Sequence, residues 1–361
     1  MSDSEKVEKP EKRKFSKIEI VGLVLVAGSM VLLLIKPGII GDLFNAMFNR
    51  AFPIVVSLYL ASSVCPAILI SVTMGRLLER LGFTDALMRI FIPLMKYIRV
   101  NASVAVPAIY NILGDINAAG KIGAPILKKA GATKDEQKIA IATMISGPSS
   151  FSILVFGIIC MTAVNAKIFL VFVLGLFVPV FVVPLLLRLT IWRDTKAVSS
   201  LADIPVFTPN KPLLTTIFGG AREGAEVLFL LIIPACAVVY AGIGALEYFH
   251  IWQYIQAGIE TLLGWLNIEP KTGTTAILAG GTLAMAQLRE IAANTPAPQV
   301  IACFILAASG FPLQVIFGQI PAIWTGPTDL SEKECILAAV VGGVIRIITA
   351  GIFGRLFIFL W

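Results

Sequence analysis

Two apolar stretches of this sequence carry polar residues at their centres. The stretch 139–161 is long enough to cross a bilayer, yet its middle reads SGPSS. Glycine and proline interrupt the hydrogen bonds of a helix, and serine hydroxyls can bind the backbone groups that are freed. The stretch 302–321 repeats the feature with Ser309-Gly310. A pair of interrupted apolar segments indicates a transport site near the middle of a membrane.

Two further groups of polar residues lie within apolar segments. Asn111 and Asp115 share one face of a predicted helix, with Asn117 nearby, and Gln287 and Glu290 form a second such face. A carboxylate is costly in a membrane unless it is paired or hydrated. Asp115 therefore has two functional interpretations: it couples transport to a proton or cation, or it forms a hydrogen bond with the substrate. The structural alternative is that it pairs with or caps the cytoplasmic end of its helix. For the second face, the alternative is a polar helix end at the opposite interface.

The two breaks have two interpretations. Broken helices can direct their N-termini at anionic groups and leave carbonyl groups free for cations, or they can simply allow close packing through small residues. Because the break recurs, we favour a binding role. The candidate substrate-binding residues are Asn111, Asp115, Asn117, Ser146, Gly147, Ser149, Ser150, Gln287, Glu290, Ser309, Gly310 and Gln314.

No arrangement of residues indicates an enzyme. Ser149 or Ser150 would need a general base to act as a nucleophile, and the single histidine, His250, lies outside any motif. The glycine-rich phosphate motif GxxxxGK[ST] does not occur. We expect neither a metal site nor an organic cofactor, while a coupling cation such as H⁺ or Na⁺ stays open.

The composition is that of a membrane protein. The chain is 57% hydrophobic and 14% charged, with a mean hydropathy of +0.89, whereas soluble domains carry about 25% charged residues. Its apolar runs are continuous rather than alternating, which favours helices over a β-barrel. The net charge of +7 is explained by cytoplasmic loops, which collect Lys and Arg, so no nucleic-acid partner is expected.

The order of elements predicts a duplication. Pro66 matches Pro234, and after a small shift Ser146-Gly147 matches Ser309-Gly310. Segments 83–98 and 251–268 either cross the membrane or lie at its interface. If they cross, each repeat has five crossings, an odd number, and the copies are inverted. The lysine-rich loop 121–137 then lies inside, so we favour inversion.

The predicted architecture is an all-α polytopic membrane protein. It has two inverted repeats of about five membrane segments each, with broken or re-entrant helices, and one additional N-terminal transmembrane helix. The expected divisions are a disordered cytoplasmic tail (1–17), the N-terminal helix and an interfacial segment (18–50), the first repeat (51–192), a polar cytoplasmic connector (193–212) and the second repeat (213–361).

Three stretches carry a family resemblance. GDINAAGKIGAPILKKAG (114–131), the SGPSS break and GGAREGAEVLFLLIIPACAVV (219–239) resemble the nucleoside-recognition, or Gate, domain family. Such domains occur in concentrative nucleoside transporters, in ferrous iron permeases and in spore maturation proteins. The resemblance covers both halves and implies a transporter-like fold with inverted repeats and helical hairpins. The GTPase domain that an iron permease would carry is not found in this sequence.

These observations predict a multi-pass permease of the cell membrane with a cytoplasmic N-terminus. It would move a small polar solute by alternating access around a site between the two broken helices, and the resemblance implies a nucleoside. The alternatives are a divalent metal-ion permease and a non-transporting assembly or signalling protein that keeps the fold. The expected partners are the lipid bilayer and the solute, with a homo-oligomer left open.

Overall fold

The computed structural model describes residues 15–61, 64–114, 116–196, 206–310 and 312–357, and within these ranges the chain is helical, without strands. Most of the predicted N-terminal tail, Asp115 and part of the connector lie outside the described residues. Among the described helices, five are long and apolar enough to cross a bilayer. They are Lys17–Ile35, Gly38–Ser57, Ile168–Thr190, Leu213–Tyr248 and Glu332–Arg355.

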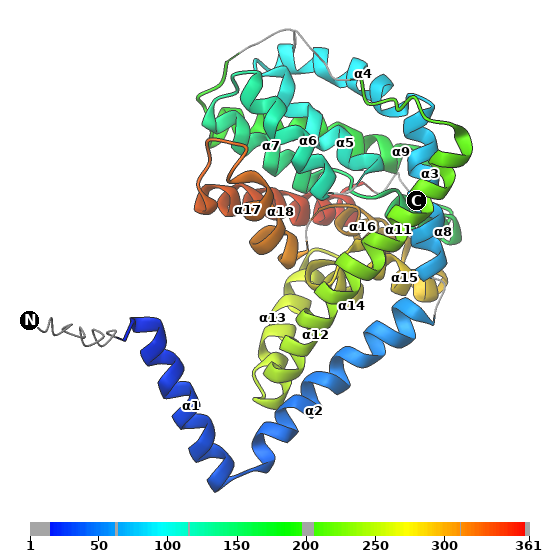
Figure 1. The fold of residues 1–361 in the computed structure, drawn as a ribbon. Coiled ribbons are helices and arrows are strands. Elements are labelled where there is room, and N and C mark those ends of the chain that lie inside the picture. The colour runs from blue at the N-terminus through cyan, green and yellow to red at the C-terminus, as the bar shows by residue number, and fades with distance from the viewer. Residues whose placement is uncertain (1–14, 62–63, 115, 197–205, 311, 358–361) are drawn as a thin grey trace, which may run out of the picture.

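The helices repeat in the same order in the two halves (Figure 1). After α1 (Lys17–Ile35), the first half contains α2 (Gly38–Phe52), η1 (Pro53–Leu60), α3 (Val64–Arg80), α4 (Phe83–Tyr97), η2 (Ala102–Val104), α5 (Ala105–Leu113), α6 (Ile116–Lys129), α7 (Lys134–Ser146), α8 (Phe151–Ala163), α9 (Ile168–Phe172), η3 (Val173–Phe177) and α10 (Val178–Thr190). The second half contains α11 (Leu213–Glu226), η4 (Val227–Ile232), α12 (Ile233–Tyr248), α13 (Trp252–Trp265), α14 (Pro270–Leu278), α15 (Gly281–Ile291), η5 (Ala292–Asn294), α16 (Ala297–Ala307), η6 (Val315–Gln319), α17 (Ile320–Trp324) and α18 (Glu332–Arg355).

Two long arms lie side by side (Figure 1): α2, η1 and α3 form one, and α11, η4 and α12 form the other. Each arm contains a π-helical segment, in which the hydrogen bonds span one more residue than in an α-helix. Small residues let the arms approach closely, as is common between membrane helices. A Cβ atom on Gly244 would lie 2.6 Å from the carbonyl oxygen of Ala46, and one on Gly220 would lie 2.9 Å from the Cα of Thr73.

The segment 37–52 differs from the sequence expectation. Instead of lying at the interface, it forms α2 and continues directly into η1, so that Gly38–Ser57 is itself long enough to cross a bilayer. Its weak amphipathic pattern reflects packing of one face against α12. This tertiary contact is not visible in the local sequence.

Helix α4 lies along one end of the bundle and does not cross it. The carboxylate of Asp85 in its first turn accepts the N–H of Phe207 at 2.9 Å. Just beyond its last turn, Asn101 donates its N–H to the carboxylate of Glu136 at 2.8 Å, and Lys196 donates to the same oxygen at 2.8 Å. Both ends of α4 therefore lie beside the connector, and the favoured interpretation of 83–98 as a crossing is wrong.

The polar spans that follow α4 and α13 are hairpins that return to the face from which they start. The side chain of Asn101, before α5, donates to the carbonyl of Ala130, after α6, at 3.1 Å. In the second half, Gln299, after α15, donates to the side chain of Asn267, before α14, at 3.3 Å. Hairpin α5–α6 and hairpin α14–α15 are therefore re-entrant.

Each repeat has the five predicted membrane segments: a long arm, a short single helix, a re-entrant hairpin, a broken span and a plain span. In the first repeat they are α2–α3, α4, α5–α6, α7–α8 and α9–α10, and in the second they are α11–α12, α13, α14–α15, α16–α17 and α18. Because hairpin α5–α6 returns to the face from which it starts and α4 does not cross, three segments of the first repeat cross. An odd number of crossings gives inverted copies, as predicted.

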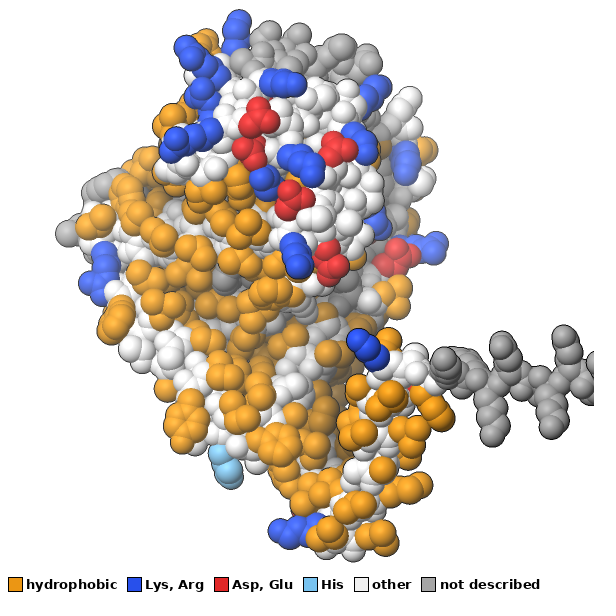
Figure 2. Space-filling model, turned by 90° about the vertical axis from the view of Figure 1, so that its left-hand side faces the viewer, with side chains coloured by type: hydrophobic (Ala, Val, Ile, Leu, Met, Phe, Trp, Pro, Cys, Tyr) orange, Lys and Arg blue, Asp and Glu red, His pale blue; other side chains and the backbone are white. Residues whose placement is uncertain are grey.

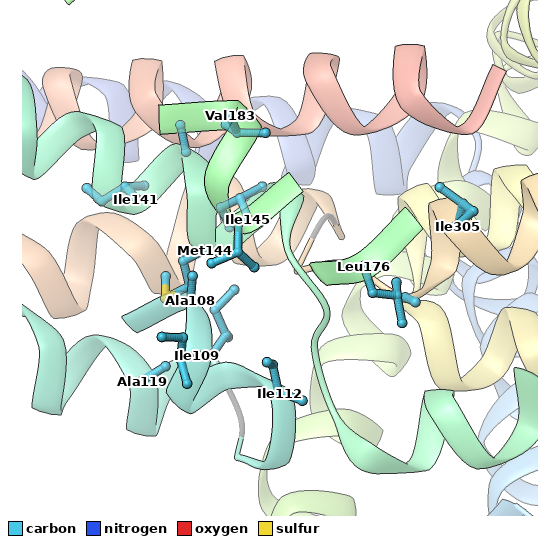
Figure 3. Close-up of a cluster of buried hydrophobic side chains, with 14 of the residues drawn as sticks. Ala108, Ile109, Ile112, Ala119, Ile141, Met144, Ile145, Leu176, Val183 and Ile305 are labelled. Carbon is cyan, nitrogen blue, oxygen red and sulfur yellow. The ribbon is translucent and has the colours of Figure 1, made fainter. Parts of the chain in front are cut away.

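The hydrophobic core lies around the broken spans. Figure 3 shows one part of it, where side chains from α5, α6, α7, η3, α10 and α16 meet, among them Ile109, Ile145, Val183 and Ile305. On the molecular surface, basic and acidic side chains gather at one end of the face in Figure 2, and hydrophobic side chains cover a broad zone below them. This distribution suits a protein that is embedded in a bilayer.

Candidate functional site

Both breaks and both hairpin tips meet at a central cavity of about 120 Å³. Six of the residues predicted from the sequence line it: Asn117, Ser149, Ser150, Ser309, Gly310 and Gln314. The two halves of the chain therefore contribute to one site, as the recurrence of the break predicts.

The first break begins where α7 ends. The N–H of Gly147 bonds to the carbonyl of Thr143 at 2.8 Å, and the hydroxyl of Ser146 donates to the same carbonyl at 3.2 Å. Pro148 then removes a donor and stops the helix. Ser150 has a φ of +67°, a left-handed value that is uncommon for a residue with a side chain. The chain resumes as α8 at an angle of 42° to α7.

The second break is built in the same way. Ser309 donates its hydroxyl to the carbonyl of Leu306, three residues earlier, at 2.6 Å, as Ser146 does to Thr143. Gly310 then donates its N–H to the carbonyl of Ile145 at 3.1 Å. The predicted match between Ser146-Gly147 and Ser309-Gly310 is therefore confirmed, and the two breaks are joined by a hydrogen bond.

Hydroxyl groups connect the first break to the tip of hairpin α14–α15. Ser150 and Ser152 share a hydrogen bond of 2.7 Å, and Ser152 shares one of 3.2 Å with Thr282. The tip itself turns at Gly280, whose φ of +137° strongly favours glycine. Sequence reasoning did not select Gly280, Gly281 or Thr282, although the Gly-Gly pair inside an apolar segment was a usable signal.

Three amide side chains near the cavity have oxygen atoms that are buried without a hydrogen-bond partner among the described residues. They belong to Asn111, Gln314 and Gln319. Gln314 and Gln319 line the cavity. Asn111 is fully buried beside the first break, where its backbone carbonyl accepts the N–H of Ser150 at 3.2 Å. Buried polar atoms without a partner are uncommon and call for an explanation, and a bound solute or ion would satisfy them.

Arg346 on α18 stabilises the backbone at the second break. Its side chain is fully buried and donates to the carbonyl of Gly175 at 2.8 Å and to that of Ala308 at 2.9 Å. Ala308 directly precedes Ser309, so the guanidinium binds a carbonyl at the C-terminal end of α16, where a cation is favourable. The partners that the described residues provide for this guanidinium are carbonyl groups.

Two of the remaining predicted residues lie away from the central cavity. Gln287 and Glu290 lie in the last turns of α15 and line a second, larger cavity. They are therefore not brought together with the serine breaks. Asp115 falls outside the described residues.

The fold and site define a class of protein. It is a helical, multi-pass membrane protein with two inverted repeats, each containing a re-entrant hairpin and a broken span, which enclose a cavity lined by both polar and apolar residues. No family model matches the chain, and no curated protein matches it. The resemblance to the Gate family therefore stays a prediction.

Solved structures do resemble it. CNTnw, a concentrative nucleoside transporter, in an inward-facing substrate-bound state superposes with a TM-score of 0.61 at 14% identity, covering 93% of this chain and 83% of that one. A variant of CNTnw in an intermediate state gives a TM-score of 0.58 at 12% identity, with 95% and 88% covered. Another variant, in an outward-facing state, also gives 0.58 at 12% identity, with 93% and 84% covered. The chain thus has the fold of these transporters over nearly its whole length.

Proposed function

We propose that this protein is a permease that carries a small, neutral, polar solute of the nucleoside class through the membrane. The central cavity is the binding site, and the two repeats expose it to each side in turn. The convergence of both breaks and both hairpin tips on this cavity is the observation that carries the proposal.

The chemistry of the cavity supports a neutral solute. Among the described residues, its polar lining consists of hydroxyl and amide groups and backbone, without a charged side chain. Such groups donate and accept hydrogen bonds to sugar hydroxyls and to the amide-like edges of a base. A hard divalent cation would instead need several carboxylate or carbonyl oxygens around it. A neutral solute therefore fits the described lining better than a divalent metal ion.

The packing supports a movement between two parts of the molecule. Two separate clusters of buried apolar residues exist, one centred on the broken spans and one on the middle of the arms. Lining residues of the cavity come from both clusters: Ile153 belongs to the first, and Tyr59 and Leu283 belong to the second. A site at such a boundary can open when one part shifts against the other.

A coupling cation is part of the proposal. The unpartnered carboxamide oxygen of Asn111 lies where the carbonyls at the end of α7 come near, because its amide nitrogen donates to Met144 at 3.4 Å. Oxygen atoms of this kind are suitable ligands for Na⁺, as at other broken helices. We expect uptake to depend on a gradient of Na⁺ or H⁺.

Uptake of labelled uridine and adenosine into proteoliposomes tests the proposal, with divalent metal ions as rival solutes. Ser149→Ala and Gln314→Leu should each lower uptake at low solute concentration about tenfold, the loss expected for one strong hydrogen bond. Asp115→Asn tests the carboxylate that the sequence singled out. Thr162→Ala is the matched control, because Thr162 lies on the exposed side of α8 and bonds only within its helix.

The outcomes separate the candidate functions. Nucleoside uptake that needs a cation gradient supports the proposal. Uptake of metal ions alone would favour the metal permease, and no uptake of either solute under any gradient would favour a non-transporting protein.

A further inference from the structure

A second cavity, of about 460 Å³, lies between the arms and hairpin α14–α15. Its walls come from α2 and α12 on one side and from α13, α14 and α15 on the other. It lies where α13 and the ends of α14 and α15 meet, on the face opposite the connector. We propose that this cavity is a second binding site for the same neutral, ring-bearing polar solute. The solute binds here before it reaches the central cavity. This inference rests on the proposed function.

The inner wall of the cavity combines aromatic rings with uncharged polar groups. Tyr240 and Trp252 are both buried and supply ring surfaces. The indole N–H of Trp252 and the hydroxyl of Thr274 are buried and have no hydrogen-bond partner in the part of the chain that the structure describes. Gln287 adds an amide from the opposite wall. A flat polar solute could stack on the rings while it bonds to the amide and hydroxyl groups.

Two of the three carboxylates that line the cavity, those of Glu260 and Glu269, already have partners within the protein. Glu260 accepts a hydrogen bond from Gln256 at 2.7 Å. Glu269 caps α14 and accepts the N–H groups of Lys271 at 3.1 Å and Thr272 at 2.6 Å. These carboxylates are therefore poorly placed to bind a metal ion, and no group of three metal-binding side chains occurs among the described residues.

The rim of the cavity carries charges of both signs. Arg50 on α2, Lys271 on α14 and Glu290 on α15 are all exposed. Charges of opposite sign at a rim give little net attraction for ions of either sign. This distribution favours a neutral or zwitterionic solute over a simple anion or cation.

The end of α14 separates the two cavities. Thr275 and Leu278 line the second cavity, and the next residues, Ala279 and Gly280, line the central one. Gly280 turns the tip with a left-handed φ, and a Cβ atom there would be in ordinary contact with Pro312, at 3.7 Å. A small movement of this tip would join the cavities, so a solute in the second cavity lies next to the central site.

Fluorescence of the purified full-length protein in detergent tests the inference. Uridine is the ligand, because it quenches tryptophan only where it binds close by, and Trp252 forms part of the second cavity. Equilibrium dialysis of labelled uridine gives the number of molecules bound. We expect two uridine molecules per chain and a quenching phase that Trp252→Phe removes.

Three variants assign the sites. Gln287→Leu should weaken the quenching phase about five- to tenfold, as expected for one lost hydrogen bond, and should leave the second binding event unchanged. Ser149→Ala should weaken the second binding event and leave the quenching phase unchanged. Gln253→Leu is the matched control, because Gln253 lies on the exposed side of α13 and outside both cavities.

Each outcome decides between the two sites. One molecule per chain whose binding only Ser149→Ala weakens would overturn the second site and leave the proposed function standing. One molecule whose binding only Gln287→Leu weakens would support the second site and contradict the central one. No uridine bound at either site would overturn both.

Discussion

The N–H of Gly310 donates to the carbonyl oxygen of Ile145 at 3.1 Å, and this bond joins the two broken spans at the edge of the central cavity. Ile145 precedes the first break and Gly310 lies within the second, so each half of the chain satisfies a backbone group that the other half exposes. A buried backbone group needs such a partner. The two breaks therefore form one structural unit.

Gly310 leaves no room for a side chain. A Cβ atom there would overlap the Cδ1 of Ile116, at the start of α6. We expect Gly310→Ala to cost about 1–3 kcal/mol through overpacking and to lower both the melting temperature and uridine uptake. Because Ile116→Val removes the atom that clashes, the double variant should recover much of the loss. Gly318→Ala, with open space around it, is the control, and an equal loss there would contradict this explanation.

Arg346 holds two segments together from within the core. Arg346→Met should leave the carbonyls of Gly175 and Ala308 without their donors, at about 1–3 kcal/mol for each. We expect a lower melting temperature in detergent, with partial recovery in Arg346→Lys. Lys333→Ala, an exposed change in the first turn of α18, should have no effect. A higher melting temperature for Arg346→Met would mean that the free-energy cost of burying the charge exceeds the stabilisation from its hydrogen bonds.

A network of ion pairs and hydrogen bonds joins α3, α11 and hairpin α5–α6 near the connector. Arg76 pairs with Glu223 and with Glu79, and it donates to the hydroxyl of Tyr110 on hairpin α5–α6 at 3.3 Å. Tyr110→Phe removes the contacts of this hydroxyl with Arg76 and Glu79 and keeps the ring contact with Phe207. A cysteine at position 117 (Asn117→Cys) would lie in the central cavity. We expect it to react several-fold faster with thiol reagents from the connector side when Tyr110→Phe is also present than when it is not.

The control for this network is a nearby exposed pair. Arg222→Gln breaks the bond between Arg222 and Glu226, which lies on the surface of α11 and should contribute little. If it raised the reactivity of the Asn117→Cys protein as much as Tyr110→Phe does, the network would not be a specific closure.

The surface position of α4 predicts which residues share one side of the membrane. Cysteines at Leu81, Lys129 and Arg193 should react with an impermeant thiol reagent from one side, and a cysteine at Gln253 should react from the other. Leu81 is a better probe than Thr84, which is buried. Labelling of Lys129→Cys and Gln253→Cys from the same side would contradict the inverted repeats.

The carboxylate of Asp85 attaches the connector to α4. The direction of its pKa shift determines how pH affects the stability of this contact. Burial tends to raise the pKa of this carboxyl, but hydrogen bonds from Thr208 and Phe207 outweigh it, and the pKa lies below its ordinary value of 3.8. A lowered pKa stabilises the folded contact above about pH 4, and the contribution is lost as the pH falls through the shifted value.

Asp85→Asn imitates the protonated form at neutral pH. We expect it to speed cleavage by trypsin after Lys196 in the connector, while Asp42→Asn, an exposed change on α2, should not. Equal cleavage rates in wild type and Asp85→Asn would show that the carboxylate does not hold the connector.

Local patterns predicted the helices and their interruptions. The apolar runs, the breaks at Ser146-Gly147 and Ser309-Gly310 and the inverted duplication are all confirmed. Proline, glycine and serine act within one helical turn, by removing donors and by capping carbonyl groups, so their effect can be read without knowledge of the fold. Ser149, Ser150 and Gln314, which the sequence at the two breaks singled out, line the central cavity.

Long-range contacts decided what the local pattern left open. The amphipathic helix α4 has the same sequence pattern whether it crosses or lies on a surface. Its Asp85 accepts the N–H of Phe207, and Asn101, beyond its other end, donates to the carboxylate oxygen of Glu136 that also binds Lys196, so α4 lies on the surface. Whether a polar span crosses or returns depends on which distant residues meet its end, as Asn267 meets Gln299. The separation of Gln287 and Glu290 from the serine breaks has the same origin, since only the packing of hairpin α14–α15 against the arms determines which cavity each face lines.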